Sequence, residues 1–300
     1  MKVAALSGGV GGAKLAEGLM RAGADLTVIA NTGDDFEHLG LSVSPDIDSL
    51  VYALSGLADR ERGWGRANES WSFMGALGAL GGETWFNLGD LDLAMHVLRS
   101  ERLAAGEPLS AVTAGFLARL GVAARVIPAT DQRLRTLVET ESGRLAFQHY
   151  FVRERTAPRV TGFTFEGAEA ARPAPGALEA LREAERIVIC PSNPYISIDP
   201  ILAVTGYRET VRNAVCVSPI IGGKAVKGPA AKMMSELGLE PSSLAVARHY
   251  RGLVRALVID EADAHEAPAI EAEGVRAVTA PTLMAGPEDA ERLARIVLEA

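Results

Sequence analysis

The stretch KVAALSGGVGGAKL, residues 2–15, decides how the rest of this sequence is interpreted. Residues 2–6 are typical of a short strand, residues 7–12 are Ser-Gly-Gly-Val-Gly-Gly, and a helical pattern follows at once. Such a turn presents backbone N–H groups and the positive end of a helix dipole, and its missing side chains allow close approach. It therefore predicts an anion site. The candidate substrate-binding residues in it are Gly8, Gly9, Gly11, Gly12 and Lys14.

Neither standard phosphate-loop pattern fits this turn. The pattern GxxxxGK[ST] fails because Leu15 follows Lys14, and GxGxxG counted from Gly9 puts Lys14 in the place of the third glycine. A tight structural turn is the alternative interpretation.

Short apolar runs alternate with helical patterns along the whole chain. Nearly continuous apolar strands are typical of a parallel sheet that is covered on both faces. The sequence therefore predicts one α/β domain, residues 1–300, with a doubly wound, Rossmann-like, mostly parallel sheet. The clearest strands are VAAL (3–6), LTVIA (26–30), ARVIP (124–128), RIVIC (186–190), AVCVS (214–218) and ALVID (256–260).

Three regions depart from this alternation. Residues 44–120 are mostly helical and contain all three tryptophans, so we expect a helical insertion that caps the ligand edge of the sheet. LRTLVETESGRLAFQHYFV (134–152) alternates like a β-hairpin with Glu141-Ser142-Gly143 as its turn. The acidic residues 260–274 predict a solvated surface segment.

Composition narrows the class of protein. A formal net charge of −8 argues against a nucleic-acid or anionic-membrane partner. No apolar run approaches the roughly 20 residues that span a bilayer, and the N-terminus lacks signal-peptide features. We therefore expect a cytoplasmic protein in which Cys190 and Cys216 are buried thiols.

Acidic residues gather after the second predicted strand. Asp34 and Asp35 follow it directly, and SPDIDS (44–49) brings Asp46 and Asp48. Ligands of open α/β sheets bind at this edge, and clustered carboxylates beside a phosphate site suit Mg²⁺. Asp46 and Asp48 are the first choice as metal ligands, and Asp34 and Asp35 are the alternatives. A single aspartate can equally be a helix cap.

Three other loops carry candidate polar residues at predicted strand or helix ends. Asp92 and His96 are four apart and so share a helix face, although His96 can equally be structural. Glycines followed by lysines after the strand at 214–218 predict a second anion cradle. The substrate-binding candidates are Asn31, Asn87, Asp92, Ser192, Asn193, Gly222, Gly223, Lys224 and Lys227. Trp64 and Trp71 are either packing residues or walls for a flat ligand.

Taken in order, these segments resemble the 2-phospho-L-lactate transferase family, which makes the deazaflavin coenzyme F-420. The matching segments are SGGVGGAKL (7–15), NTGDD (31–35), SPDIDSLVYALSG (44–56), DRERGWGRANESW (59–71), NLGDLDLAMHVLRS (87–100), PSNPYISIDPIL (191–202) and SPIIGGKAVKGPAAKMM (218–234). One departure is Leu91, where the family usually has Arg in GDRD. Arg99, two helical turns further on, can compensate for the lost charge.

The resemblance implies a reaction. A phospho-lactyl or phosphoenolpyruvyl group passes from a guanosine diphospho donor to the terminal ribityl hydroxyl of the deazaflavin Fo, giving F-420-0 or its dehydro form and GMP. Mg²⁺ is the expected cofactor, and a homodimer is the expected assembly. The expected catalytic carboxylate, which orients or deprotonates the hydroxyl, is Asp46 or Asp90.

Two other functions remain open at this point. The same superfamily contains non-enzymatic regulators that bind UDP-sugars through a similar glycine turn, and such a protein would bind a nucleotide without consuming it. An NAD(P)-dependent oxidoreductase is weakened by the broken GxGxxG pattern.

Overall fold

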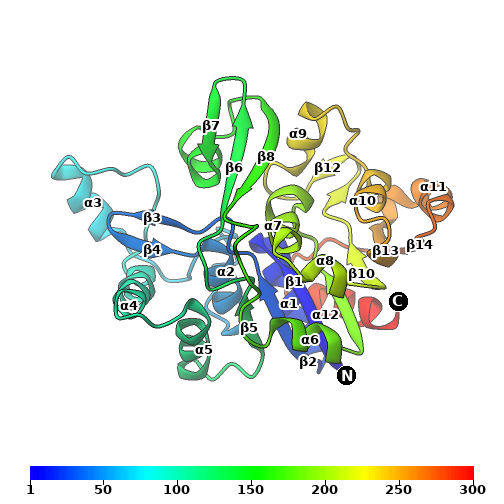
Figure 1. Cartoon of the computed structure of the whole chain (residues 1–300), viewed down its shortest axis with the longest axis horizontal. Helices are drawn as coiled ribbons and strands as arrows, with labels where there is room; N and C mark the ends of the chain where they lie inside the picture. Colours follow the sequence, from blue (N-terminus) through cyan, green and yellow to red (C-terminus); the bar gives the residue numbers. More distant parts are fainter.

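A seven-stranded parallel sheet forms the centre of the computed structural model, which describes all 300 residues (Figure 1). Its strands, in spatial order, are β14 (Arg276–Ala280), β13 (Val254–Asp260), β10 (Ala214–Val217), β9 (Arg186–Ile189), β1 (Lys2–Ser7), β2 (Asp25–Ala30) and β5 (Arg125–Pro128). Every neighbouring pair is parallel. This confirms the predicted doubly wound α/β sheet.

The strand order reverses beside β1. The chain continues from β1 to β2 and β5 on one side, whereas β9, β10, β13 and β14 follow one another on the other side. Leu6 pairs with Ile29 of β2 and with Ile189 of β9, so the carboxyl ends of these strands lie level. A reversal of this kind opens the crevice in which open α/β sheets bind ligands.

Helices cover both faces of the sheet, which explains its continuous apolar strands. Val3 and Ala5 point into one hydrophobic core, and Ala4 and Leu6 point into the other. The first core includes α1 (Gly9–Arg21), α2 (Pro45–Leu54), α5 (Leu109–Arg119) and α12 (Pro287–Glu299). The second includes α6 (Ala177–Glu183), η2 (Pro194–Ile198), α7 (Asp199–Ala203), α8 (Tyr207–Thr210), α9 (Ala230–Glu236), α10 (Ser243–His249) and α11 (Ala267–Ala272).

The stretch between β2 and β5 contains the region predicted as a helical insertion. Helix α2 packs on α1 and so belongs to the layer that covers the sheet. The other parts lie to one side of the sheet in Figure 1. They are β3 (Phe36–His38), β4 (Leu41–Val43), α3 (Ser72–Ala79) and α4 (Asp92–Ala104).

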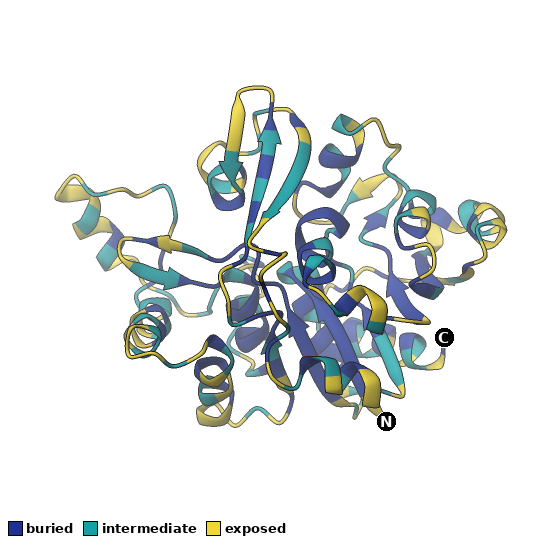
Figure 2. Cartoon of the chain, viewed as in Figure 1, coloured by how far each residue is buried: buried dark blue, intermediate teal, exposed yellow.

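The predicted β-hairpin is confirmed and is part of a three-stranded antiparallel sheet. Its strands are β7 (Gly143–Ala146), β6 (Arg135–Thr140) and β8 (Val160–Glu166) in spatial order. The extension of the hairpin through residues 149–153 is wrong, because these residues form a π-helical turn, η1 (His149–Arg153). Figure 2 shows that the tip of the β6–β7 hairpin is exposed, whereas the central sheet is buried.

Several short elements were not predicted. They are β14, β11 (Ile220–Ile221), β12 (Lys224–Ala225) and the 3-10 helix η3 (Glu261–Glu266). The solvated segment at 260–274 is mostly exposed as expected, but Asp263 and Ile270 within it are buried. Both cysteines are free and buried, as predicted. None of the helices combines the length and the apolar character that a membrane span requires.

Candidate active site

A cavity of about 660 Å³ lies where the carboxyl ends of β1 and β9 meet. Residues as far apart in the chain as Gly8 and Pro229 line it. The predicted site residues that line it are Gly8, Gly9, Gly11, Asp34, Asp46, Asp48, Asn87, Asp92, Ser192, Asn193 and Lys227. Most of the candidates therefore share one site, and their individual roles remain predictions.

The glycine turn after β1 packs so tightly that side chains would not fit. A Cβ atom on Gly8 would lie 2.6 Å from Asp46 Oδ2 and from Ser197 Cβ, and one on Gly12 would lie 2.7 Å from Ser192 Oγ. Gly8 N donates to Ser192 Oγ at 3.1 Å, and the same hydroxyl donates to Gly8 O at 2.7 Å. The two loops at the strand ends are thereby joined, with the first turn of α1 facing the cavity.

The carboxylate of Asp46 is fixed by hydrogen bonds from two other segments of the chain. Its Oδ1 accepts a hydrogen bond from Gly9 N at 2.6 Å, and its Oδ2 accepts one from Asn31 Nδ2 at 2.9 Å. Asn31 also donates to Ile196 O, at 3.1 Å, and does not line the cavity. Asn31 is therefore a buried support for Asp46 and does not contact a ligand in the cavity.

Asp34 and Asp46 are carboxylates without a cationic partner in the protein. Burial raises the pKa of Asp46 to about 6, although the hydrogen bonds from Asn31 and Gly9 act to lower this pKa. Burial and then the charge of Asp46 raise the pKa of Asp34 well above its usual value. Asp34 Oδ1 is buried and has no hydrogen-bond partner. Burial therefore disfavours the charged forms of both groups, and a cation bound in the cavity would favour them.

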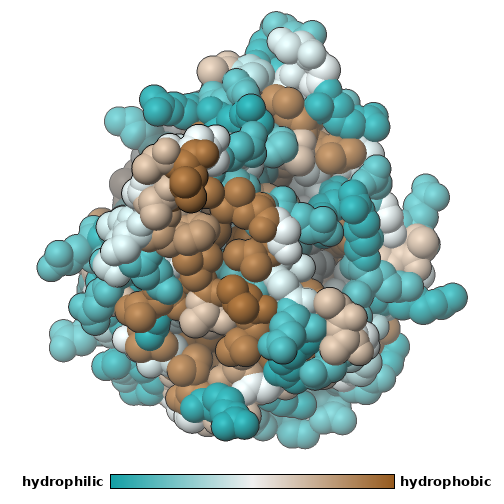
Figure 3. Space-filling view, turned by 90° about the vertical axis from the view of Figure 1, so that its left-hand side faces the viewer, coloured by the Kyte–Doolittle hydropathy of each residue, from teal (hydrophilic) through white to brown (hydrophobic).

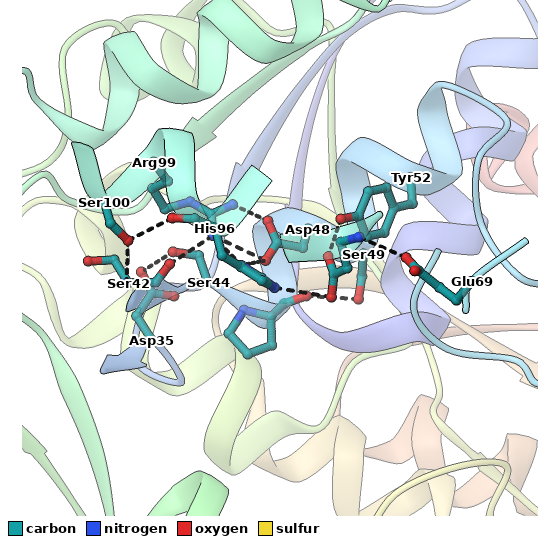
Figure 4. A network of polar contacts seen from close by, with 12 residues as sticks. Asp35, Ser42, Ser44, Asp48, Ser49, Tyr52, Glu69, His96, Arg99 and Ser100 are labelled. Carbon is teal, nitrogen blue, oxygen red and sulfur yellow. Dashed lines mark hydrogen bonds and ion pairs between the residues drawn. The ribbon is translucent and has the colours of Figure 1, made fainter. Parts of the chain in front are cut away.

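Asp48 also lines the cavity, but a buried arginine neutralises it (Figure 4). Arg99 Nη1 lies 3.2 Å from Asp48 Oδ2, Arg99 Nη2 bonds to Oδ1, and the arginine side chain is fully buried. Arg99 Nη1 also donates to Ser42 O at 3.3 Å. Because Asp48 has this partner, it is a weaker candidate for a metal ligand than Asp34.

Asp35 points away from the cavity, although it is adjacent to Asp34. Its Oδ2 accepts a hydrogen bond from Ser44 Oγ at 2.8 Å. Burial raises its pKa to about 7, opposed by the charges of Arg135 and Arg99. The structure therefore leaves Asp35 outside the set of carboxylates that a bound metal could reach.

Aromatic side chains form another wall of the cavity. Trp64, Phe86, Phe147 and Phe151 all line it. The rings of Phe147 and Phe151 stack with centroids 5.4 Å apart and an interplanar angle of 9°. In a helix, residues four apart come into contact, whereas the strand predicted for AFQHYFV would hold these two rings about 13 Å apart. Trp71 does not line the cavity but packs against Trp64, with ring centroids 6.3 Å apart.

Asp90, predicted as catalytic, does not line the cavity. Its carboxylate accepts hydrogen bonds from Ser70 Oγ at 2.6 Å, from Phe73 N at 3.0 Å and from Ser72 N at 3.1 Å. It therefore holds the N-terminal end of α3. Leu91, which stands where GDRD has arginine, is 41% exposed and does not line the cavity.

Lys14 and the predicted second anion cradle also lie outside the cavity. Lys14 Nζ donates to Met284 O at 2.8 Å. Gly222 and Gly223 have φ of +57° and +72° and make the tight turn between β11 and β12. Gly222 N already donates to the carboxylate of Asp263 at 3.0 Å, and Lys224 is exposed. This turn needs glycine for its conformation, and of the four candidates in this cradle only Lys227 lines the cavity, together with its neighbours Gly228 and Pro229.

Comparisons with known proteins point to the family that the sequence motifs resemble. A family model described as 2-phospho-L-lactate transferase CofD matches residues 3–283. The chain is 43% identical over 311 residues to a phosphoenolpyruvate transferase of Streptomyces griseus, covering 100% of this chain and 98% of that protein. It is 38% identical over 298 residues to a 2-phospho-L-lactate transferase of Methanosarcina mazei, covering 98% of each.

The fold is also similar to a crystal structure of a UPF0052 family member from Bacillus halodurans. The TM-score is 0.63 and the identity 17%, with 99% of each chain covered. At this identity the likeness concerns the fold alone.

Proposed function

The chain belongs to the 2-phospho-L-lactate transferase family, and from this premise we propose that it is the transferase that builds F-420-0, or its dehydro form, in coenzyme F-420 biosynthesis. The donor is a guanosine diphospho three-carbon acid, the acceptor is the ribityl hydroxyl of Fo, and GMP is released. The observation that carries the proposal is the pairing of a glycine-walled cradle with two carboxylates that lack a cationic partner in the protein, all in one cavity.

Charge balance in the cavity supports a divalent cation. Four carboxylates line the cavity, those of Asp34, Asp46, Asp48 and Asp92, of which Asp48 is neutralised by Arg99, and Lys227 is the one lysine or arginine in the lining. A donor with a diphosphate and a carboxylate would add further negative charge. The wall therefore fits an anionic ligand only when a cation accompanies it.

Asp34 and Asp46 are the residues that would hold Mg²⁺. The structure has no group of three or more His, Cys, Asp or Glu side chains with metal-site geometry. Mg²⁺ is commonly bound by one or two carboxylates with water and substrate phosphates as the other ligands, which suits this pair. The bound ion would neutralise charge on the diphosphate during displacement at phosphorus.

The glycine turn and the loop after β9 would position the diphosphate. The first turn of α1 has amide N–H groups without intrahelical partners, and these favour an anion. Ser192 holds the turn in place, and Asn193 and Lys227 bring polar groups to the same cavity. This arrangement supplies the positioning that dominates catalysis of phosphoryl-type transfers.

The aromatic wall would bind the deazaflavin. Fo has a flat tricyclic ring, and Trp64, Phe86 and Phe151 offer the apolar and aromatic surfaces that such rings require. The polar side chains of Asp92 and Gln148 lie in the same cavity and suit the hydroxyl groups of the ribityl chain.

The test is a reconstituted reaction. Purified protein is mixed with Fo, Mg²⁺ and, in separate samples, the lactyl, phosphoenolpyruvyl and phosphoglyceryl guanosine donors. We expect release of GMP together with a product that carries the phospho-acid, and loss of both on addition of EDTA. Failure with all three donors, combined with tight binding of a UDP-sugar in calorimetry, would instead support the non-enzymatic regulator.

We also propose a homodimer that forms through the face carrying α3 and α4. Residues 72–82 contain no charged side chain, and Leu80 at the end of α3 is 88% exposed. On α4, Val97 and Leu98 are also exposed, and Figure 3 shows a broad apolar surface on this side of the molecule. Exposed apolar patches of this kind mark interfaces, and two-fold dimers are the commonest assemblies.

A further inference from the structure

Asp92 lines the part of the cavity proposed to hold the ribityl chain, and it is the cavity carboxylate that neither belongs to the proposed cation site nor pairs with an arginine. Asp34 and Asp46 form the proposed cation site, and Asp48 is paired with Arg99. Asp92 begins α4, lines the cavity and keeps 17% of its side chain exposed. It can therefore contact a ligand in the cavity without first giving up a protein cation.

Contacts on both carboxylate oxygens fix the direction of Asp92. The hydroxyl of Tyr52 donates to Oδ1, and Nε2 of His96 lies 3.1 Å from Oδ2. The backbone N–H of Asp92 donates to Glu69 Oε1 at 2.8 Å. The carboxylate is thus held from α2 and α4, and the backbone of Asp92 is held from the loop before α3.

Arg99 decides which nitrogen of His96 carries the proton. Arg99 Nη1 lies 3.3 Å from His96 Nδ1, and a guanidinium group can only donate (Figure 4). Nδ1 therefore accepts, and the proton of the neutral ring is on Nε2, which faces Asp92. Tyr52 stays protonated as well, because burial and the nearby charges of Asp48 and Asp92 raise its pKa.

We propose that Asp92 is the catalytic base that accepts the proton of the attacking hydroxyl, and that His96 and Tyr52 are positioning residues that orient it. This inference rests on the proposed function and adds to it the group that receives the proton. It replaces Asp90, which faces away from the cavity, in the role predicted from the sequence.

The step balances as a single displacement. The hydroxyl oxygen of the acceptor forms a bond to the phosphorus that carries the three-carbon acid. The bond from this phosphorus to the bridging oxygen breaks, and GMP leaves with the electron pair. The hydroxyl proton moves to the carboxylate of Asp92, which later returns it to water.

A weak base is sufficient for this step. Burial opposes ionisation of Asp92, but the contact with the Nε2–H group of His96 and the hydrogen bond from Tyr52 hold its pKa below the usual value. It is therefore ionised at neutral pH. In a loose transition state the attacking oxygen keeps its proton until late, and in protein kinases an aspartate has the same role.

The test compares Asp92→Asn with Glu101→Gln, an exposed acidic residue on the same helix. General bases contribute about 10²–10⁴-fold to rates. We expect Asp92→Asn to lower kcat for GMP release by about 10²-fold or more. Binding of Fo, followed by its fluorescence, should change less than about fivefold, and Glu101→Gln should resemble wild type in both measurements.

A pair of His96 variants tests whether His96 orients the carboxylate of Asp92. His96→Gln keeps an N–H donor for Asp92, whereas His96→Leu has the bulk without the donor. We expect His96→Leu to lower kcat by about tenfold or more with little change in KM for Fo, and His96→Gln to restore part of the loss. Equal effects in both variants would make His96 a packing residue only.

The outcomes separate this inference from the proposed function. If the wild-type protein transfers no phospho-acid from any of the three donors, the proposed function fails and the inference fails with it. If the wild type is active and Asp92→Asn keeps kcat within threefold, the inference alone is overturned. The same holds if Asp92→Asn loses Fo affinity by the factor by which it loses kcat/KM.

Discussion

At the scale of single residues, Asp46 carries the largest expected effect on activity. Asp46→Asn removes one of the two carboxylate charges proposed to hold Mg²⁺ while it keeps the size of the side chain. Charge stabilisation by a metal contributes several kcal/mol, so kcat should fall by about 10²-fold or more. The measurement is GMP release over a titration of Mg²⁺, with the exposed Glu37→Gln as the control. A near-normal rate at ordinary Mg²⁺ concentrations would refute the metal assignment.

Asp35 should act on stability rather than on catalysis. Its pKa in the folded chain is about 7, compared with an ordinary value of 3.8. Between these pH values the unfolded chain has released the proton and the folded chain keeps it, so this residue lowers stability as pH rises from 4 to 7. We expect the free energy of unfolding of Asp35→Asn to exceed that of wild type by up to about 4 kcal/mol as the pH rises through this range. Thermal or urea unfolding at several pH values measures this difference in stability. The prediction would be contradicted if the stability of the two proteins changed in the same way with pH.

The position of a residue at the cavity was predictable from the sequence where local structure determines it. The glycines of residues 7–12 and the pair Asp46 and Asp48 stand out because strand, turn and helix follow one another directly. Sequence reasoning did not distinguish Asp34 from Asp35, since neighbouring residues of a loop can face either way. The partner of Asp48 is Arg99, 51 residues later, and such a long-range ion pair has no local signal.

At the scale of elements, the junction of β1 and α1 should tolerate no side chain. A Cβ atom on Gly8 would lie 2.6 Å from Asp46 Oδ2 and from Ser197 Cβ. Gly8→Ala should therefore displace Asp46 and weaken both donor binding and Mg²⁺ dependence, with a loss of stability of about 1–3 kcal/mol. Calorimetry with GDP and thermal unfolding measure the two effects.

Gly75→Ala is the matched control for this variant. Gly75 lies in α3, where a Cβ atom would meet nothing within 4 Å, and alanine is the better helix former. Its GDP affinity should equal that of wild type and its stability should be the same or higher. Equal GDP affinity in Gly8→Ala and Gly75→Ala would contradict the proposed anion cradle.

Helices and strands were predictable where apolar residues follow a regular pattern along the chain, and were missed where the pattern is weak or continues past the end of the element. Six of the seven sheet strands appear as apolar runs, whereas RAVTA of β14 is a half-exposed edge strand with a weaker signal. The π-helical turn at 149–153 follows a hairpin whose alternation continues into it, so the sequence pattern favoured a strand. In the structure this segment turns helically, and Phe147 stacks on Phe151 four residues later.

At the scale of the whole molecule, the cavity depends on loops that only the complete fold brings together. Lys227 Nζ donates to Gly63 O at 2.8 Å, which joins two loops 164 residues apart, and both residues line the cavity. The sequence predicts each loop as a separate binding segment but not their contact. Sheet topology explains the convergence, because every parallel strand delivers its following loop to the same edge.

The apolar face of α3 and α4 gives the prediction for the assembly. If this face joins two copies, wild type should have twice the 31.6 kDa mass of the chain in analytical ultracentrifugation at micromolar concentration. A charge buried in an interface is costly, so Leu98→Asp should weaken the dimer by about 100-fold or more. The exposed Leu239→Asp lies away from this face and should leave the mass unchanged. A monomeric wild type, or equal dissociation in both variants, would show that another partner or none covers this surface.

Because Leu98 is 48% exposed and α4 also carries Asp92, retained GMP release in the Leu98→Asp monomer would further show that each copy contains a complete site.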